Sequence, residues 1–198
     1  MSNIHPIFDT ILSREDKEKF LNQKAMAIWM VGLSGSGKST LARALETSLH
    51  DAGFFTKLLD GDNLRTGINK NLGFSDEDRV ENIRRAAEVC KLFVEGGVIP
   101  ICSLISPTHE IRSMARDIIG ADKFYEVFVD CPLEICEQRD VKGLYAKARR
   151  GEIKDFTGID SVFEEPQNPS LVVKTGENSL EDSHHLLLKS IQEKITLN

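Results

Sequence analysis

Short apolar runs alternate along the chain with longer stretches in which apolar residues recur every three or four positions. The runs are rich in β-branched residues, which is typical of strands buried in a sheet. The longer stretches are typical of helices with one buried face, and Leu41, Leu45 and Leu49 form such a face. Pro100 interrupts the third run, because proline cannot donate a hydrogen bond to a sheet ladder. The runs predict strands over residues 25–31, 54–59, 98–102, 125–129 and 171–173.

Two of the predicted helices have signals at their ends. Apolar residues from Ile83 to Val94 predict a helix that stops at Gly96 and Gly97, because glycine commonly terminates helices. Ser179 begins a Ser-x-x-Asp pattern, which is typical of a helix N-terminus. The last helix is therefore expected over residues 179 to about 195.

The alternation of predicted strands and helices indicates an α/β fold. A mostly parallel sheet of about five strands should be flanked by helices in three layers, with right-handed crossovers. Binding sites then belong at the carboxyl ends of the strands. We expect an N-terminal helical extension over residues 1–24 and a single domain over 25–198. Within that domain, residues 140–166 turn to Lys, Arg, Gly and short polar residues, which predicts a lid segment.

The composition limits the partners and the location of the protein. A chain of 198 residues with 40% apolar residues is long enough for one well-buried domain. Its net charge of −6 argues against a surface for nucleic acid or an anionic membrane, so the expected partner is a small anion bound by a local cluster. The sequence has neither a membrane-span pattern nor a signal-peptide pattern, and its four cysteines form no C-x-x-C pair. We therefore expect a cytoplasmic protein with buried free thiols.

Residues 32–39, with the sequence GLSGSGKS, match the motif G-x-x-x-x-G-K-[ST] between a predicted strand and a predicted helix. In such a loop the backbone N–H groups turn toward phosphate oxygens, and the N-terminus of the following helix adds its positive end. Lys38 is expected to reach the β- and γ-phosphates of ATP, and the Ser39 hydroxyl is expected to bind Mg²⁺. The predicted ATP-binding residues of this P-loop are Gly32, Leu33, Ser34, Gly35, Ser36, Gly37, Lys38, Ser39 and Thr40.

A P-loop alone does not distinguish a kinase from a GTPase or a motor ATPase. Residues 117–120 match D-x-x-G, but a pattern with two fixed positions often arises by chance. Guanine recognition usually needs N-K-x-D, and residues 69–72 read NKNL instead. The chain length and the basic lid favour a kinase acting on a small molecule.

Asp60, Gly61 and Asp62 follow the second predicted strand and should lie near the P-loop. A carboxylate at this place can orient an attacking hydroxyl, accept its proton or hold a water on Mg²⁺. Asp62 is the preferred catalytic candidate, and either Asp60 or Asp62 could bind Mg²⁺ through water. The alternative is a plain turn, because Asp-Gly is a common turn dipeptide.

Several arginines follow Asp62 in the sequence, and an arginine side chain can bind an oxyanion through two parallel hydrogen bonds. Arg65 and Arg79 are expected in loops, where we favour anion binding. Arg84 and Arg85 are expected on the solvated face of a helix.

Three further residues have two interpretations each. Phe74 and Phe156 stand in polar loops, where each could pin its loop to the core or stack on a purine, and spacing alone does not decide. Ser106 is suited to cap a helix that begins at Pro107, and the free N–H groups of that helix could face an anionic ligand.

The chain resembles the adenylylsulfate kinases (APS kinases) over about residues 25 to 195. An ordered set of segments carries this resemblance, and it is far more specific than any one motif. The segments after the P-loop are DGDNLR at 60–65, LGFS at 72–75, DRVENIRR at 78–85, ISP at 105–107, KGLY at 142–145, KAR at 147–149 and FTGID at 156–160.

The resemblance implies ATP-dependent phosphorylation of the 3′-hydroxyl of adenosine 5′-phosphosulfate (APS), giving 3′-phosphoadenosine 5′-phosphosulfate (PAPS) and ADP. It places Asp62 at the 3′-hydroxyl and Phe74 and Phe156 on either side of the substrate adenine, and it implies a homodimer. The residues that it assigns to the phosphosulfate are Arg65, Arg79 and Asn82, with the backbone of Ile105 and Ser106. It assigns lid closure to Lys142, Leu144, Phe156, Thr157 and Gly158, and it places Arg139 and Thr175 near the ATP adenine.

Two features qualify the resemblance. Some members of the family have a phosphorylated serine at the position of Ser106, but we expect direct in-line transfer as the main route here. Residues 108–110 (THE) and 161–164 (SVFE) depart from the usual pattern on the acceptor side. The alternatives are therefore a kinase for the 3′-hydroxyl of a different 5′-substituted nucleotide, or a regulatory module that binds nucleotide without turnover.

Overall fold

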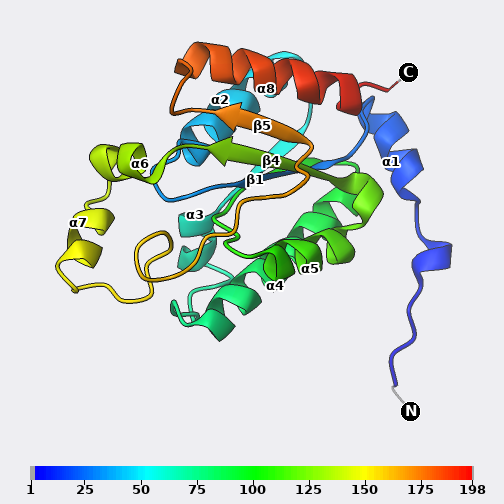
Figure 1. The fold of residues 1–198 in the computed structure, drawn as a ribbon. Helices are drawn as coiled ribbons and strands as arrows, with labels where there is room; N and C mark the ends of the chain where they lie inside the picture. The colour runs from blue at the N-terminus through cyan, green and yellow to red at the C-terminus, as the bar shows by residue number, and fades with distance from the viewer. Residues whose placement is uncertain (1–2, 198) are drawn as a thin grey trace.

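The computed structural model describes residues 3–197 and contains five parallel strands between two layers of helices (Figure 1). The strand order is β2-β3-β1-β4-β5, so the predicted mostly parallel sheet is confirmed. Each strand lies within two residues of its predicted position. The bounds are Ala27–Val31 for β1, Thr56–Asp60 for β2, Ile99–Ser103 for β3, Phe124–Asp130 for β4 and Leu171–Lys174 for β5.

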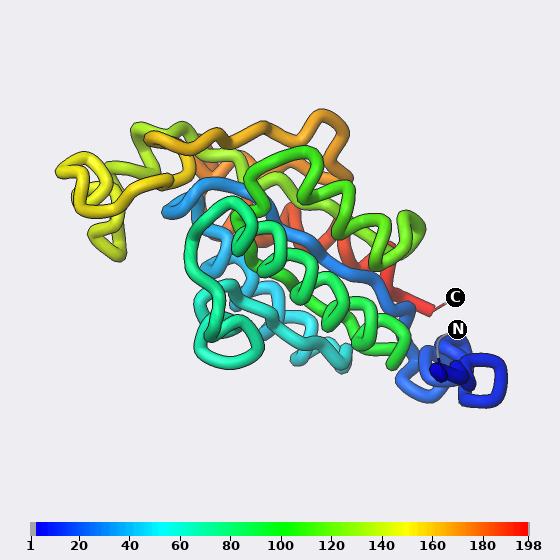
Figure 2. Tube along the Cα trace, turned by 90° about the horizontal axis from the view of Figure 1, so that it is seen from below, coloured from blue at the N-terminus to red at the C-terminus, as the bar shows by residue number. Residues whose placement is uncertain are grey.

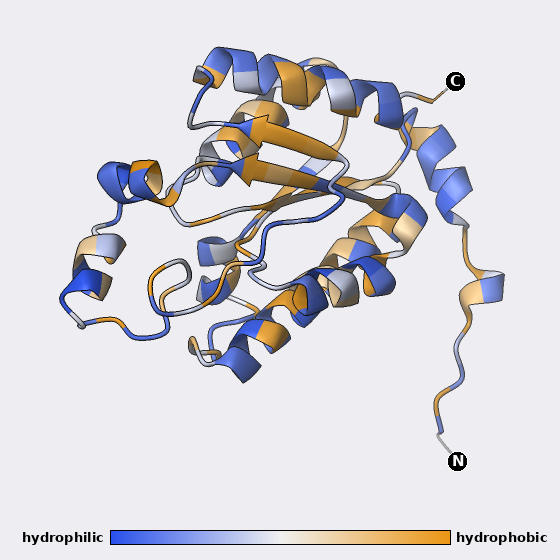
Figure 3. Ribbon diagram, in the orientation of Figure 1, coloured by the Kyte–Doolittle hydropathy of each residue, from blue (hydrophilic) through white to orange (hydrophobic). Residues whose placement is uncertain are grey.

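Alternate side chains of the sheet supply two separate cores. Ala27, Trp29 and Val31 of β1 pack with α4 (Asp76–Glu95) and α5 (His109–Ile119). The intervening Ile28 and Met30 pack with α2 (Lys38–Asp51) and α8 (Leu180–Ile195) on the opposite face. Figure 3 shows the apolar strands between helices whose outer faces are hydrophilic. The three-layer prediction is thus confirmed by the period-two pattern of the central strand.

Pro100 lies inside β3, between β2 and β1, although proline is rare in inner strands. The Ile99 N–H donates to the Phe55 carbonyl on the β2 side. Because successive residues of a strand point their N–H groups to opposite sides, the nitrogen of Pro100 faces β1. The pairing of β3 with β1 begins one residue later, at Ile101 with Ile28. The N–H that Pro100 lacks would therefore lie at the start of the β3–β1 ladder, so its absence weakens that ladder little.

Shorter elements complete the chain. The N-terminal extension contains a 3₁₀ turn, η1 (Phe8–Thr10), and α1 (Arg14–Leu21), which is tied to the body by a hydrogen bond from Lys17 Nζ to the Glu95 carbonyl. In Figure 2 this extension lies at the end opposite to the segment around residues 140–160. Residues 1 and 2 of the predicted extension lie outside the described residues. The remaining elements are α3 (Gly61–Thr66), η2 (Ala121–Lys123), α6 (Leu133–Arg139) and α7 (Leu144–Arg149).

The two predicted helix caps have different outcomes. Ser179 caps α8 and accepts a hydrogen bond from the Asp182 N–H, as the sequence predicted. The predicted cap at Ser106 is wrong, because α5 begins at His109 and the Thr108 side chain accepts from the Ile111 N–H. Ser106 instead adopts a left-handed conformation with φ of 47°. Across residues 3–197, none of the helices is both long enough and apolar enough to cross a bilayer.

Candidate active site

A cleft of about 870 Å³ opens at the carboxyl ends of the strands, between the P-loop, α3, α4 and the predicted lid. Figure 1 shows α6 and α7 at the end of the sheet toward which β4 and β5 point. The structure brings most of the predicted site residues to this one cleft. They are Ser34, Gly35, Gly37, Lys38, Ser39, Thr40, Asp60, Asp62, Arg65, Phe74, Arg79, Asn82, Ile105, Ser106, Arg139, Lys142, Leu144, Phe156, Thr157 and Thr175.

Gly32, Leu33, Ser36 and Gly158 do not line the cleft. Gly32 passes so close to β4 that a Cβ would lie 2.6 Å from the Val129 carbonyl oxygen. Leu33 and Gly158 line a second cavity of about 610 Å³ behind the P-loop. Gly32 is therefore packed against β4, and Ser36 is fully buried.

Side chains from three later segments hold the outer side of the P-loop. The Ser34 carbonyl accepts from the Tyr145 hydroxyl at 2.9 Å. The Gly35 carbonyl receives a longer contact of 3.4 Å from Arg139, which also donates to the Thr175 carbonyl at 2.7 Å. The Ser36 carbonyl accepts from the Thr175 hydroxyl at 2.6 Å. Arg139 and Thr175, which the resemblance places near the ATP adenine, thus lie beside the loop.

Lys38 lies at the start of α2 with its amino group turned toward the loop backbone. Its Nζ donates to the carbonyls of Gly32 and Leu33 at 2.9 and 2.7 Å. Burial lowers the pKa of Lys38 to about 8. An anion placed in the loop gives this amine a better partner than two neutral carbonyls and favours its charged form.

Oxygen donors gather at the N-terminus of α2. The Ser39 hydroxyl donates to Asp60 Oδ2 at 2.7 Å and lies 3.1 Å from Ser103 Oγ. Mg²⁺ prefers such hard oxygen ligands, and it usually combines a few protein groups with waters and substrate phosphates. This donor set fits Mg²⁺, although residues 3–197 contain no cluster of three or more His, Cys, Asp or Glu side chains for a metal. Ser103 was not among the predicted site residues, although its place directly after the predicted strand 98–102 was a usable signal.

Asp62, the predicted catalytic carboxylate, forms an ion pair with Lys142 of the predicted lid. The Asp62 N–H donates to Asp60 Oδ1 at 3.0 Å, so Asp60 caps α3 and fixes the start of that helix. Both side chains of the ion pair are more than half exposed, which leaves the carboxylate accessible from the cleft.

Arg65 and Arg79 are in helices α3 and α4, so their predicted placement in loops is wrong. Both nevertheless line the cleft. Burial lowers the pKa of Arg65, and the neighbouring positive charge of Arg79 lowers it further. Two cations held together in this way favour an anionic ligand between them.

Arg79 also joins the loop of Phe74 to the lid. Its Nε donates to the Phe74 carbonyl at 2.9 Å and its Nη1 to the Thr157 hydroxyl at 2.7 Å. Its Nη2 donates to the Asp155 carbonyl. Every nitrogen of this guanidinium is therefore engaged by protein acceptors.

The two phenylalanines line the same cleft in different surroundings. Phe74 is 64% exposed, and the Arg65 guanidinium lies 4.3 Å from its ring centroid. Phe156 packs edge-on against Tyr145 with ring centroids 5.0 Å apart. Phe156 thus anchors its loop to a small core while it lines the cleft, so its two interpretations are compatible.

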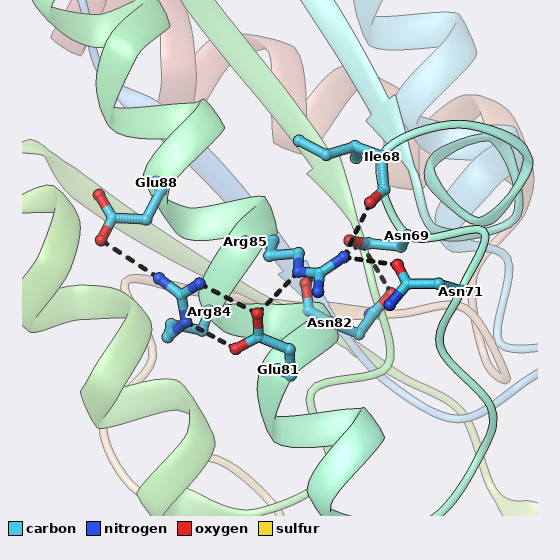
Figure 4. Close-up of polar contacts among 8 residues, drawn as sticks. All are labelled: Ile68, Asn69, Asn71, Glu81, Asn82, Arg84, Arg85 and Glu88. Carbon is cyan, nitrogen blue, oxygen red and sulfur yellow. Dashed lines mark hydrogen bonds and ion pairs between the residues drawn. The ribbon is translucent and has the colours of Figure 1, made fainter.

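Arg84 and Arg85 lie on α4 (Figure 4). Neither is among the residues that line the cleft. Arg84 pairs with Glu81 and Glu88 on the exposed helix surface, as expected of a solvated face. Arg85 pairs with Glu81 and also donates to the Ile68 carbonyl at 3.0 Å, so it braces the preceding loop.

Asn82 is buried, and its Oδ1 accepts from Asn69 Nδ2 at 2.9 Å. Figure 4 shows this contact next to the charged network of α4. The Asn82 side chain therefore reaches the cleft from a position that Asn69 fixes.

The turn at Ser106 is held from two sides. The Trp29 indole N–H donates to Ser106 Oγ at 3.1 Å, and Arg112 donates to the Ser106 carbonyl at 2.8 Å. Ser106 is only 1% exposed, so a phosphorylating agent would need a local opening of this turn. Sequence analysis missed Arg112, which is buried and pairs with Glu126 at 3.4 Å.

The segments that depart from the usual pattern meet each other. The Glu164 N–H donates to the Pro107 carbonyl at 2.8 Å, and the Glu164 carboxylate accepts from the His109 N–H at 2.5 Å. His109 Nδ1 lies 2.8 Å from Arg112. The two segments that depart from the family pattern thus contact each other, and they connect the end of the predicted lid to the Ser106 turn.

Comparison with known proteins agrees with this geometry. A family model described as adenylylsulphate kinase matches residues 24–174. A protein from Bacteroides thetaiotaomicron named adenylyl-sulfate kinase is 59% identical over 194 residues, covering 98% of this chain and 96% of that protein. One of the same name from Clostridium kluyveri is 54% identical over 185 residues, covering 93% of this chain and 92% of that protein.

Solved structures give the same picture. The APS kinase CysC of Mycobacterium tuberculosis, in complex with AMPPNP and APS, superposes with a TM-score of 0.82 at 45% identity, covering 85% of this chain and 98% of that one. A sugar kinase from Janibacter, 18% identical with a TM-score of 0.61, covers 85% of this chain and 95% of its own and shares the fold alone.

Proposed function

The chain belongs to the adenylylsulfate kinase family, and from this membership we infer that it transfers the γ-phosphoryl group of ATP to the 3′-hydroxyl of APS, giving PAPS and ADP. The observation that carries this conclusion is the single cleft that joins the P-loop to Arg65, Arg79, Phe74 and Phe156. The P-loop part of the cleft suits a triphosphate. The part lined by the arginines and phenylalanines suits an anionic nucleotide whose base can stack on an aromatic ring.

We propose that the P-loop binds the ATP phosphates through its backbone N–H groups and the N-terminus of α2. Lys38 then leaves the carbonyls of Gly32 and Leu33 and donates to the β- and γ-phosphates. Arg139 and Thr175 hold the loop and lie next to the ATP base. Since phosphoryl transfer needs positioning and charge neutralisation, a preformed loop supplies much of the catalysis.

Ser39 would bind Mg²⁺ directly, and Asp60 would bind it through water. When bound, this ion neutralises charge on the β- and γ-phosphates. The proposal is supported by the cluster of Ser39, Asp60 and Ser103 oxygens. The proposed reaction requires no protein ligands to Mg²⁺ other than Ser39 and, through water, Asp60.

On the acceptor side, Asp62 aligns the 3′-hydroxyl and accepts its proton as the O–P bond forms. For Asp62 to accept the proton, Lys142 must first release it from their ion pair. Lys142 can then pair with the phosphosulfate or with the transferred phosphoryl group. Arg65, Arg79 and Asn82 bind the phosphosulfate, with the backbone of Ile105 and Ser106. Phe74 and Phe156 stack on the adenine, and Leu144, Thr157 and Gly158 complete the closed lid, which excludes water as a competing acceptor.

A coupled assay of ADP release with purified protein tests the reaction. APS should support turnover, whereas other 5′-substituted adenosine nucleotides should support at most about a hundredth of that rate, since a site whose polar groups pair with the sulfate rejects ligands that lack it. Turnover with another nucleotide and not with APS would identify the alternative kinase. A flat signal with every nucleotide would favour the regulatory module.

We also propose that the protein acts as a cytoplasmic homodimer. Its four cysteines are free and buried, which suits a reducing compartment. A relative from Thiobacillus denitrificans is described as a hexameric APS kinase, and the N-terminal extension exposes apolar side chains such as Ile7 and Phe8. Light scattering at micromolar concentration should give twice the chain mass, and a monomer mass would contradict the dimer.

A further inference from the structure

Tyr145 connects the P-loop to one of the two aromatic rings of the acceptor side. It lies in α7 of the lid and is 1% exposed. Its hydroxyl donates to the Ser34 carbonyl at 2.9 Å, across 111 residues of sequence. Its ring meets the Phe156 ring edge-on, at 5.0 Å between centroids and 79° between planes. A single side chain therefore contacts both substrate regions.

The backbone of Tyr145 is fixed as well. The Asp140 carboxylate accepts hydrogen bonds from the N–H groups of Tyr145 and Ala146, each at 3.0 Å. Backbone hydrogen bonds, first from Ala146 and then from Tyr145 and Leu144, lower the pKa of Asp140, because they stabilise its charged form. The start of α7, and with it the backbone of Tyr145, is therefore held in place by Asp140.

A small apolar core surrounds this contact, separate from the two cores that cover the sheet. Its buried members are Cys131, Cys136 and Tyr145, and Leu33 of the P-loop packs against it together with Phe156. Gly158, at φ of 91°, comes so close that a Cβ would lie 2.9 Å from Leu33 Cδ2. The lid and the P-loop thus share packed side chains in addition to the hydrogen bond.

We propose that Tyr145 is a positioning residue that couples occupancy of the P-loop to the placement of Phe156, and through Phe156 to binding of the acceptor's adenine. The proposal rests on the proposed function. The loop is already shaped without ligand. A triphosphate reduces the remaining motion of the Ser34 carbonyl, so Tyr145 and the face of Phe156 are held more tightly before the acceptor arrives. Binding of the acceptor then costs the protein less conformational entropy, which gives positive coupling between the two sites.

The test measures APS affinity by calorimetry, with and without saturating AMPPNP and Mg²⁺, so that no turnover occurs. In the wild type we expect AMPPNP to tighten APS binding about fivefold or more, within the usual range of coupling between sites. Tyr145→Phe removes only the hydroxyl, and we expect the ratio of the two APS affinities to fall to within about twofold of unity. AMPPNP affinity without APS is measured in each variant, so that loss of a P-loop brace is separated from loss of coupling.

Tyr125→Phe is the matched control. Tyr125 is also buried and its hydroxyl bonds to Ser190 Oγ, but it lies in β4 away from the cleft. It should keep the wild-type coupling even if its melting temperature falls. A merely structural role of Tyr145 would lower stability in the same way and leave the coupling intact.

Leu33→Ala gives a second test through packing and does not touch the hydroxyl. It should reduce the coupling in the same direction, and AMPPNP affinity without APS is measured in parallel because Leu33 belongs to the P-loop. Equal coupling in the wild type and Tyr145→Phe, or absence of coupling in the wild type, would overturn the proposal. A wild type that turns over with APS and shows either result leaves the function intact, whereas a wild type that neither binds nor phosphorylates APS overturns both.

Discussion

The donor and acceptor sides of the cleft are built in different ways. The donor side is one continuous segment, residues 32–40, whose backbone is held by close contacts with β4 and by three side chains. The acceptor side is assembled from side chains of α3, α4, the Ser106 turn and the lid. Its cations already have protein partners, since Arg79 binds the lid and Lys142 binds Asp62.

This difference indicates how much of each ligand's contact energy is needed to reorganise the protein. The loop meets a phosphate with a backbone that is already in place, so little reorganisation is needed. The acceptor must draw Arg79 and Lys142 from existing partners, so part of its contact energy goes to replace those bonds. Substitutions on the donor side should therefore act on turnover, and those on the acceptor side should act first on the KM for APS.

Removal of the P-loop amine should have the largest effect. We expect Lys38→Ala to lower kcat by about 10³-fold or more, because no other side chain in the loop supplies positive charge to the transferring phosphate. ADP release with saturating APS measures it, and a thermal melt confirms folding. A loss below about tenfold would show that the backbone alone provides the donor-side catalysis.

Asp62→Asn should come next. The amide keeps the shape but cannot accept a proton, so kcat should fall about 10²- to 10³-fold. Binding of AMPPNP, measured by calorimetry, should stay as in the wild type, because Asp62 does not contact the loop. Near-normal turnover would mean that another carboxylate, with Asp60 the first to examine, serves the hydroxyl.

Arg79→Met should separate the two sides most clearly. The KM for APS should rise about 10- to 100-fold, as expected from loss of charge-assisted hydrogen bonds, while the KM for ATP changes little. Arg84→Met on the same helix is the matched control, because within residues 3–197 Arg84 forms ion pairs only with Glu81 and Glu88, outside the cleft (Figure 4). Parallel rises in both KM values would contradict the division into two sides.

The smallest effect concerns pH. Hydrogen bonds from Arg84 and Arg85 lower the pKa of Glu81 to about 2. A carboxylate with a lowered pKa stabilises the fold above its unfolded-state pKa and loses that contribution as the pH falls through the lowered value. NMR titration should therefore show Glu81 charged at pH 4, and Arg84→Met should move its midpoint upward. An unshifted midpoint in the variant would assign the effect to Arg85 alone.

The sequence predicted the donor side well because the P-loop is local. A contiguous motif between a strand and a helix determines both the backbone path and the ligand. The strands were also predicted closely, since β1 alternates between two cores along five consecutive residues. The roles assigned to individual site residues stay predictions, although most of those residues meet in one cleft.

Predictions failed where distant residues decide local structure. Ser106-Pro107 has the pattern of a helix start, but Trp29 and Arg112 hold Ser106 in a left-handed turn, and the helix begins at His109. The contact of Tyr145 with the P-loop was not visible, because its partner Ser34 is remote in sequence. Arg65 was expected in a loop because α3 has only six residues, too few to show a helical period.

The three tethered carbonyls of the P-loop also bear on its use in protein engineering. Ser34, Gly35 and Ser36 depend on Tyr145, Arg139 and Thr175, which come from three later parts of the chain. A graft of the eight-residue motif into another scaffold would carry the phosphate-binding amides but leave behind the frame that shapes them. The transplantable unit is the loop together with its three braces.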